Sequence, residues 1–210
     1  MIAVIDYGMG NLRSVSKAIE HVAPGVTVRV TDDPVVVRSA DRVVFPGQGA
    51  MPDCVRELRG RGLYEAVIEA ARDKPFLGIC IGLQMLFERS EEGDTPGLGI
   101  LPGRVRRFAH ALTDDRGQKL KVPHMGWNEV EQSAAHPLWQ GIAQNSRFYF
   151  VHSYYAEPAN VDLIAGTSRY PAAFACAAVR DNLFAVQFHP EKSAAAGLRL
   201  LANFATWTPA

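Results

Sequence analysis

A cysteine between two glycines is the residue whose surroundings point most directly to chemistry. Cys80 is the centre of the stretch GICIG, residues 78–82. Residues 75–79 predict a short buried strand and residues 81–87 predict the start of a helix, so Cys80 falls at a sharp strand-to-helix turn. The free N–H groups at the start of that helix favour a thiolate at Cys80, and the N–H of Ile81 could donate to a developing oxyanion. A buried structural cysteine is the alternative, and the turn by itself does not separate the two interpretations.

A histidine and a glutamate follow a second apolar run far downstream. Residues 184–188, FAVQF, predict a buried strand that ends at His189-Pro190-Glu191. A cysteine nucleophile needs a general base, and that base needs an acid that orients it. On an extended backbone residues 189 and 191 point the same way, so Glu191 could reach the imidazole of His189. For the triplet alone a surface histidine and glutamate is the simpler interpretation. His189 and Cys80 each follow a predicted buried strand. In an open parallel sheet the carboxyl ends of the strands face one crevice, which favours a common site for the two residues.

Two further features are expected beside this crevice. The loop PGQGA, residues 46–50, follows a predicted strand, and Gly47 and Gly49 allow its backbone N–H groups to face a bound carbonyl. An ordinary Gly-Pro turn is the alternative for this loop. Gln84 lies four residues after Cys80, which places both on one face of a helix. A solvated glutamine on the helix surface is the alternative there.

The elements that must position these residues alternate along the chain. Strands are predicted at residues 2–5, 26–30, 42–45, 105–108, 119–122, 128–131, 147–152, 163–166, 173–179 and 183–188. Helices are predicted at residues 12–22, from 31 onward as a short helix, at 51–73 with a break near Gly60 and Gly62, and at 193–205 with Ser193 as the cap. Hairpin turns are expected at 113–117 and at Asp181-Asn182. The pattern predicts a single α/β domain over residues 1–210, with a mainly parallel open sheet flanked by helices and antiparallel strands added in the second half.

The amino-acid composition limits the classes of protein to which the chain could belong. The chain has 210 residues, 48% hydrophobic and 21% charged, with 22 basic and 22 acidic side chains. This balance gives no indication of nucleic-acid or membrane-surface binding. Three cysteines without framework spacing fit a reducing compartment, and the first residues lack the features of a signal peptide, so we expect a cytoplasmic protein.

Neither a metal nor a cofactor is expected. The spacing of His124, Trp127 and His136 matches no metal-ligand motif. The G-x-G at residues 8–10 lacks the rest of a dinucleotide-binding fingerprint, so a tight strand-to-helix turn explains it better.

The stretch GICIGLQ with a late HPE triplet resembles the class I (triad type) glutamine amidotransferase family, over nearly the whole chain. Three further segments narrow this resemblance: DYGMGNLRSV at 6–15, PHMGWN at 123–128 and YFVHSY at 149–154. Together they are similar to one branch of the family, the glutaminase subunits of imidazole glycerol phosphate synthase in histidine biosynthesis.

The resemblance implies hydrolysis of the glutamine side-chain amide through a cysteine thioester, and it assigns roles to individual residues. The catalytic residues implied are Cys80, His189 and Glu191. The oxyanion hole implied is made by Gly47, Gln48, Gly49 and Ile81, where Gln48 departs from the small apolar residue expected in many relatives. The residues implied to bind glutamine are Gln84, His152, Ser153 and Tyr154. The residues implied at the partner interface or along the ammonia route are Asn11, Arg13, Tyr149 and Lys192.

The resemblance also implies a partner. Ammonia would pass to a (β/α)₈-barrel cyclase subunit in a heterodimer, where imidazole glycerol phosphate and an aminoimidazole carboxamide ribotide are formed. Two alternatives stay open. The chain could serve another amidotransferase of the anthranilate synthase type, against which the segments at 6–15 and 123–128 argue. It could also be a non-catalytic scaffold of the same fold, against which the intact Cys80, His189 and Glu191 argue.

Overall fold

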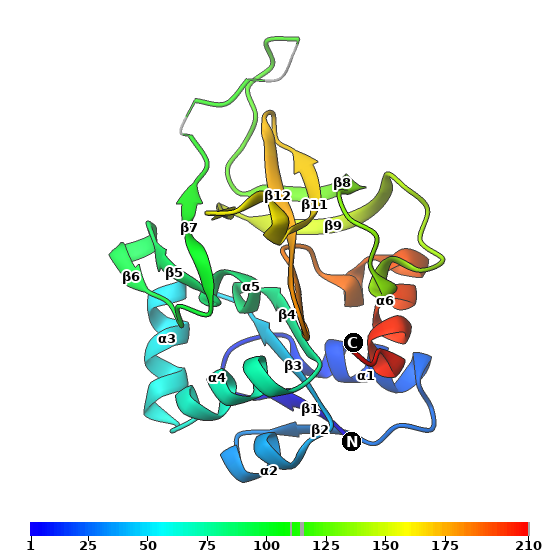
Figure 1. Cartoon of the computed structure of the whole chain (residues 1–210). Helices are drawn as coiled ribbons and strands as arrows, with labels where there is room; N and C mark the ends of the chain where they lie inside the picture. Colours follow the sequence, from blue (N-terminus) through cyan, green and yellow to red (C-terminus); the bar gives the residue numbers. More distant parts are fainter. Residues whose placement is uncertain (110, 114–115, 210) are drawn as a thin grey trace.

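Five parallel strands form the part of the molecule that supports the residues singled out above (Figure 1). The computed structural model describes residues 1–109, 111–113 and 116–209. The parallel strands lie in the order β2 (Val28–Thr31), β1 (Ile2–Ile5), β3 (Arg42–Gly47), β4 (Phe76–Cys80) and β13 (Leu183–Val186). Every residue of β1, β4 and β13 is buried. Their near-continuous apolar runs are what a parallel sheet covered on both faces requires.

Helices pack against this sheet, and several of their ends lie where the sequence predicts them. They are α1 (Leu12–Val22), α2 (Pro34–Ser39), α3 (Met51–Gly60), α4 (Tyr64–Asp73), α5 (Ile81–Met85) and α6 (Ala194–Thr206). Helix α1 packs against α6, and α2 packs against α4. The predicted start of α2 is confirmed, because the Asp33 side chain accepts the Val35 N–H at 2.8 Å and Pro34 follows it. The predicted break between residues 51 and 73 is confirmed as the turn between α3 and α4.

The strands beyond β13 extend the sheet mainly with antiparallel pairs, and most of them belong to the second half of the chain. Beyond β13 the order continues through β12 (Ala173–Arg180), β10 (Tyr154–Pro158), β7 (Leu101–Arg107), β5 (Phe87–Ser90) and β6 (Thr95–Pro96). A branch leaves β12 through β11 (Ile164–Arg169), β8 (His124–Gln132) and β9 (Ser146–His152). Among these strands only β5 and β7 pair in parallel within the described residues. The predicted α/β fold, with antiparallel strands in the second half, is confirmed.

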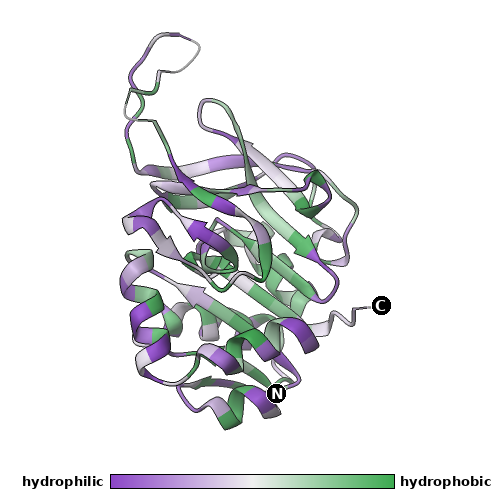
Figure 2. Ribbon diagram, turned by 60° about the vertical axis from the view of Figure 1, so that its left-hand side comes forward, coloured by the Kyte–Doolittle hydropathy of each residue, from purple (hydrophilic) through white to green (hydrophobic). Residues whose placement is uncertain are grey.

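One apolar core runs through both halves. Figure 2 shows hydrophobic residues concentrated on the central strands, whereas hydrophilic residues lie on the outer faces of the helices. Phe45, Phe76 and Phe184 are fully buried on the parallel strands, and Phe148 and Phe150 are fully buried on β9. The tilted rings of Phe148 and Phe188 have centroids 4.1 Å apart, so the segment between β13 and His189 is packed against β9.

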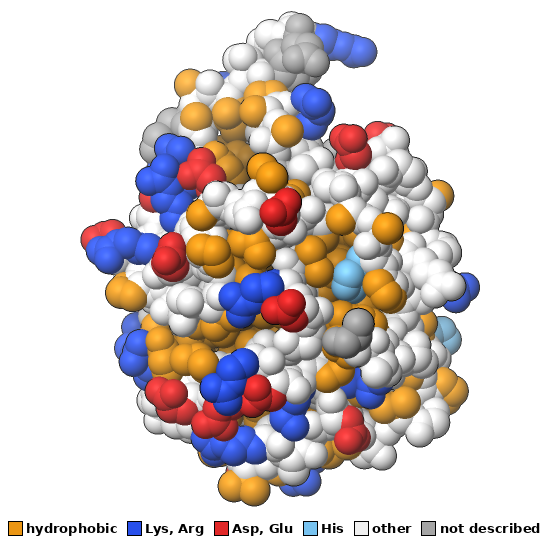
Figure 3. All heavy atoms as spheres, in the orientation of Figure 1, with side chains coloured by type: hydrophobic (Ala, Val, Ile, Leu, Met, Phe, Trp, Pro, Cys, Tyr) orange, Lys and Arg blue, Asp and Glu red, His pale blue; other side chains and the backbone are white. Residues whose placement is uncertain are grey.

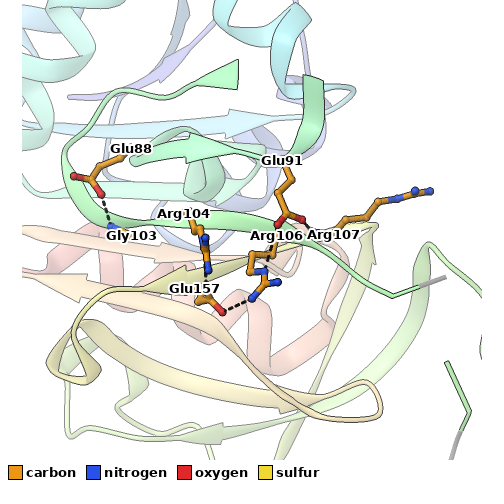
Figure 4. A network of polar contacts seen from close by, with 7 residues as sticks. All are labelled: Glu88, Glu91, Gly103, Arg104, Arg106, Arg107 and Glu157. Atoms are coloured by element: carbon orange, nitrogen blue, oxygen red, sulfur yellow. Dashed lines mark hydrogen bonds and ion pairs between the residues drawn. The ribbon is translucent and has the colours of Figure 1, made fainter. Parts of the chain in front are cut away.

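A polar network joins β10 to β7 and to the end of β5, which are consecutive in the sheet (Figure 4). Glu157 on β10 accepts hydrogen bonds from Arg104 at 2.8 Å and Arg106 at 3.1 Å, both on β7. Glu91, just after β5, accepts the Arg107 N–H at 2.8 Å. The side chains of the Glu157 pairs are half exposed, so each pair adds little stability, but together they favour one register of β7 against β10.

Several predicted boundaries are wrong. Residues 119–122 form no strand, and within the described residues a single bridge joins Thr113 to Lys119. An alternating pattern becomes a strand only where a neighbouring strand is present to pair with it. The turn predicted at 113–117 falls partly on residues 114–115, outside the described residues. Strand 183–188 ends at Val186 and the helix predicted over 81–87 ends at Met85. Strand 26–30 lies instead at 28–31, and β5, β6 and β10 were not predicted.

Candidate active site

The predicted turn at Cys80 is confirmed, and it is strained. Cys80 ends β4 and precedes α5 with a φ of 57°, a conformation that non-glycine residues rarely adopt. The neighbouring glycines permit this turn to pack closely. A Cβ on Gly82 would lie 1.8 Å from the Phe45 carbonyl oxygen, and a Cβ on Gly78 would lie 2.9 Å from the Ala185 Cβ. The sequence pattern therefore fixes the thiol at the carboxyl end of the sheet.

The predicted contact between His189 and Glu191 is present, although the extended backbone expected to produce it is not. Nδ1 of His189 lies 2.9 Å from Oε1 of Glu191, and both side chains are almost completely buried. Pro190–Lys192 form a short 3₁₀ turn that brings the carboxylate back to the ring. Because a carboxylate can only accept, Nδ1–H donates to it, which leaves Nε2 free to exchange protons.

Electrostatics favour a protonated His189. Burial by itself lowers the pKa of His189, but the interactions with Cys80 and with Glu191 outweigh the burial and raise the pKa to about 10. An imidazolium beside a thiolate is the paired form that makes a cysteine nucleophilic at neutral pH.

Ser193 holds the backbone of His189 in place. Its hydroxyl donates to the His189 carbonyl at 2.6 Å and accepts the Tyr149 N–H at 3.0 Å. The His189 N–H in turn donates to the Tyr149 carbonyl at 2.9 Å. The predicted helix cap at Ser193 is therefore wrong in its chemistry. Ser193 occupies the position before α6 but makes no side-chain cap, because its hydroxyl is engaged with β9 and the His189 turn.

Most of the residues implied by the family resemblance line one cavity of about 240 Å³ at the carboxyl ends of β3 and β4. From that set the lining contains Gln48, Gly49, Cys80, Ile81, Gln84, His152, Ser153, Tyr154, His189 and Lys192. Glu92, Pro123 and Val151, which had not been predicted, complete it. The volume suits a ligand the size of an amino acid.

The other implied residues lie away from the cavity lining. Gly47 pairs with Cys80 in the sheet, and Glu191 lies behind His189. Tyr149 lies on β9, where the Lys192 ammonium is 5.9 Å from its ring. Asn11 is partly buried and Arg13 is exposed, at the start of α1.

Two buried glutamines connect Cys80 to the opposite wall of the cavity. Gln84 is buried, and its Nε2 donates to Oε1 of Gln187 at 3.0 Å and to the Tyr154 carbonyl at 3.1 Å. Gln187 Nε2 lies 3.7 Å from the Cys80 sulfur. Gln187 was not predicted as a site residue, although a polar residue inside the apolar run FAVQF was a signal for it.

A chain of neutral side chains supports residues 152–154. Nδ1–H of His152 donates to the Tyr154 carbonyl at 2.8 Å, so its Nε2 accepts from Nδ1–H of His124 at 2.9 Å. Asn128 Nδ2 lies 3.2 Å from Nε2 of His124 and donates to the Arg169 carbonyl at 2.8 Å. Burial lowers the pKa of His152 to about 3 and that of His124 to about 4, so both rings stay neutral. The segment PHMGWN was the signal that could have identified His124 as part of the site.

Several buried polar atoms have no hydrogen-bond partner in good geometry among the described residues, and those of His189 (Nε2), Gln84 (Oε1) and Glu191 (Oε2) belong to the site. Unpaired buried polar atoms are rare in folded proteins and are available to a ligand that can hydrogen-bond. Among the described residues, no group of three or more His, Cys, Asp or Glu is arranged to hold a metal ion. Within that same part of the chain, no helix has the length and apolarity needed to cross a membrane.

The outer surface is mixed in character. Figure 3 shows acidic and basic side chains interspersed with hydrophobic ones on the face seen in Figure 1. Two large apolar side chains of β8, Met125 and Trp127, are 62% and 44% exposed. They follow Pro123, which lines the cavity and directly precedes β8, by two and four residues.

Comparison with known proteins agrees with this geometry. A family model described as "Glutamine amidotransferase class-I" matches residues 3–207. Two relatives, from Nitrosospira multiformis and Thiobacillus denitrificans, are each 68% identical over 99% of this chain and over 98% and 92% of their own lengths. Both are named imidazole glycerol phosphate synthase subunit HisH.

Solved structures share the fold at low sequence identity. One described as a glutamine amidotransferase has a TM-score of 0.73 at 15% identity, covering 97% of both chains. The glutaminase domain of the Trypanosoma brucei protein CTPS, with bound acivicin, has a TM-score of 0.64 at 16% identity, covering 100% of this chain and 95% of its own.

Proposed function

The chain belongs to the class I glutamine amidotransferase family, and from this premise we propose that it is the glutaminase subunit of an imidazole glycerol phosphate synthase. The observation that carries the chemistry is the shared cavity of Cys80 and His189, with His189 bound to Glu191 at 2.9 Å. The observation that carries the branch of the family is the high identity to relatives named as this subunit over almost their whole length.

The first half-reaction forms a thioester. The Cys80 thiolate attacks the side-chain carboxamide carbon of glutamine, and the carbonyl oxygen becomes an oxyanion. Backbone N–H groups of Ile81 and of the loop formed by Gly47, Gln48 and Gly49 stabilise this charge. His189, protonated because of its raised pKa, donates its Nε2 proton to the departing nitrogen, and ammonia leaves.

The second half-reaction releases glutamate. Neutral His189 takes a proton from water through Nε2, and the hydroxide attacks the thioester carbon. The carbon–sulfur bond breaks and restores the Cys80 thiolate and the imidazolium. Glu191 keeps the proton on Nδ1, so Nε2 remains the atom that exchanges protons in both steps. One glutamine and one water thus give one glutamate and one ammonia.

The rest of the cavity holds the amino acid. Gln84 binds glutamine, and the backbone of His152, Ser153 and Tyr154 holds the α-carboxylate. Two observations support this assignment. The Oε1 atom of Gln84 has no partner among the described residues, and the 152–154 backbone is fixed by the neutral His152 ring.

The acceptor for ammonia lies on another chain. Free ammonia would be protonated in water and would lose its nucleophilicity. It must therefore reach its acceptor through a route shielded from water. We propose a heterodimer with a (β/α)₈-barrel cyclase, with Asn11 and Arg13 at the interface and Tyr149 and Lys192 along the route. The exposed Met125 and Trp127 beside the cavity support docking on this side. The partner would form imidazole glycerol phosphate and an aminoimidazole carboxamide ribotide in the cytoplasm, and the present chain would act as a single glutaminase domain.

Glutamine hydrolysis by the purified chain tests this proposal. It should be slow alone and strongly stimulated by a barrel cyclase with its ribonucleotide ligand. Cys80→Ala should abolish it, while Cys176→Ala, which changes a buried cysteine on β12, should not. Stimulation by a chorismate-using subunit instead would indicate an anthranilate-type partner. Activity that survives Cys80→Ala would contradict the mechanism.

A further inference from the structure

Tyr7 carries a buried hydroxyl that the mechanism above does not use. It lies in the turn between β1 and α1 and is 0% exposed, and its ring packs against Phe45 with centroids 5.5 Å apart. Its hydroxyl oxygen has no partner in good hydrogen-bond geometry among the residues that the structure describes, and the nearby Cys54 thiol interacts with it closely enough to add to the rise in its pKa that burial causes. A hydroxyl that loses water without gaining a partner is costly, so its retention needs an explanation.

The hydroxyl lies against the loop that lines the cavity. A Cβ on Gly47 would be 2.4 Å from the Tyr7 hydroxyl oxygen and 2.8 Å from the Ile81 Cβ. Gly47 is also the residue that pairs with Cys80 across β3 and β4. Since Gly47 has no side chain, nothing separates the hydroxyl from the loop backbone, directly behind the predicted oxyanion hole.

A second protein group already holds the next peptide of the same loop. The Cys54 thiol, on α3, donates to the Gln48 carbonyl at 3.6 Å. In a trans peptide the carbonyl points opposite to the N–H of the following residue. The Cys54 contact therefore turns the Gly49 N–H away from α3, and Gly49 lines the cavity.

Both groups remain neutral donors. Burial is the main cause that raises the pKa of Tyr7 well above its ordinary value, and Cys54 adds to it. Burial also raises the pKa of Cys54 to about 11. Each side chain thus keeps its proton at neutral pH and can donate a hydrogen bond to a backbone carbonyl.

We propose that Tyr7 is a positioning residue for the oxyanion hole, an inference that rests on the proposed glutaminase function. Its hydroxyl donates to the Gly47 carbonyl when the Gln48 N–H faces the oxyanion of the tetrahedral intermediate. The Gly47 carbonyl and the Gln48 N–H belong to one trans peptide and point in opposite directions. When the Gln48 N–H points into the cavity, the Gly47 carbonyl therefore points toward Tyr7. Tyr7 and Cys54 would then each fix one of two successive N–H donors.

The test is Tyr7→Phe in the complex with the cyclase and its ligand. Because the hydrogen bond serves the transition state, kcat should fall about tenfold to a hundredfold while KM for glutamine changes less than about twofold. The melting temperature of the chain should stay equal or rise, because an unpaired buried hydroxyl is removed. Tyr64→Phe makes the same change on α4, where the ring lies 3.8 Å from the Arg59 guanidinium, and should leave all three values unchanged.

Two further measurements separate positioning from packing. The γ-aldehyde analogue of glutamine adds the Cys80 sulfur to its carbonyl carbon and presents a tetrahedral oxygen to the same N–H groups. Its affinity should fall in Tyr7→Phe by about the same factor as kcat. Cys54→Ala should also lower kcat, and Cys54→Ser, which keeps a donor, should restore most of it.

The outcomes distinguish this inference from the proposed function. If the wild-type complex hydrolyses glutamine and Tyr7→Phe keeps the wild-type kcat, the role of Tyr7 is overturned. The same holds if Tyr7→Phe lowers the melting temperature by several degrees, because the hydroxyl would then be bonded in the resting fold. A wild-type complex that does not hydrolyse glutamine would instead contradict the proposed function, and the inference with it.

Discussion

Glu191 binds Nδ1 of His189 at 2.9 Å through a turn of only one intervening residue, and the two side chains are 1% and 6% exposed. Pro190 begins the 3₁₀ turn that makes this contact, so the orienting acid is supplied by the local chain and not by a distant element. A buried carboxylate at this position keeps the proton on Nδ1 and raises the pKa of His189.

Glu191→Gln should lower kcat about a hundredfold, the scale on which a positioned acid–base group contributes. The substitution removes a negative charge that helps to raise the pKa of His189. The alkaline limb of the profile of kcat/KM against pH should therefore move to lower pH. Glu69→Gln, at an exposed carboxylate that pairs with Arg38, is the matched control and should leave the profile unchanged. If the alkaline limb of the kcat/KM profile stays at the wild-type pH in Glu191→Gln, Glu191 does not set the charge of His189.

Acid should destabilise the fold through His152 and His124. Their pKa values in the folded chain, about 3 and about 4, lie below the ordinary value of about 6.5 for an unfolded histidine. As the pH falls below about 6.5 the unfolded chain binds these protons first, so the free energy of unfolding decreases toward pH 4. Each histidine contributes a slope of up to about 1.4 kcal/mol per pH unit.

Urea unfolding between pH 7 and pH 4 measures this slope. His124→Asn removes one of the histidines whose pKa is lowered by burial, a set that also includes His136 at about 4, and should make the pH dependence shallower, whatever its effect on stability at pH 7. His21→Asn, at an exposed position on α1, should leave the wild-type slope. Equal slopes in wild type and His124→Asn would mean that the His124 ring is not held neutral.

Ser193→Ala should lower both stability and turnover. The change leaves the Tyr149 N–H without its acceptor and frees the His189 carbonyl, at an expected cost of about 1–3 kcal/mol. For a chain of this size that corresponds to a fall in melting temperature of about 2–10 °C. Ser146→Ala also removes a hydroxyl, one that donates to the Ala143 carbonyl at an exposed site, and should have a smaller effect. A wild-type kcat in Ser193→Ala would show that His189 is held without this hydroxyl.

Gly82→Ala should prevent correct folding of the turn after Cys80. The new methyl group would overlap the Phe45 carbonyl oxygen, which lies 1.8 Å from its position in the rigid strand β3. Gly60→Ala, where a methyl group meets nothing within 4 Å, should fold normally. Circular dichroism and melting temperature compare the two variants. A folded Gly82→Ala with the wild-type melting temperature would mean that α5 can move away from β3 at little cost.

Local patterns in the sequence were sufficient to predict many of the elements and the reactive centre. The alternation of apolar runs with short turns predicted β1, β3, β4, α1, α3 and α4. The glycines around Cys80 predicted the strained turn, because only residues without a Cβ fit there. Asp33-Pro34 predicted the start of α2, and HPE predicted a histidine with its own acid. Each of these signals lies within about five residues of the feature it determines, so no knowledge of distant contacts was needed.

The tertiary structure alone decided which distant groups meet at the cavity. Gln84 and Gln187 are 103 residues apart in the sequence, Gln187 and Cys80 are 107 apart, and His124 and His152 are 28 apart. The strand pairing that brings them together also places the Tyr7 hydroxyl behind Gly47 and the Ser193 hydroxyl under β9. A side chain's hydrogen-bond partner depends on the register of strands that the chain adds later, and no local pattern of residue types records that register.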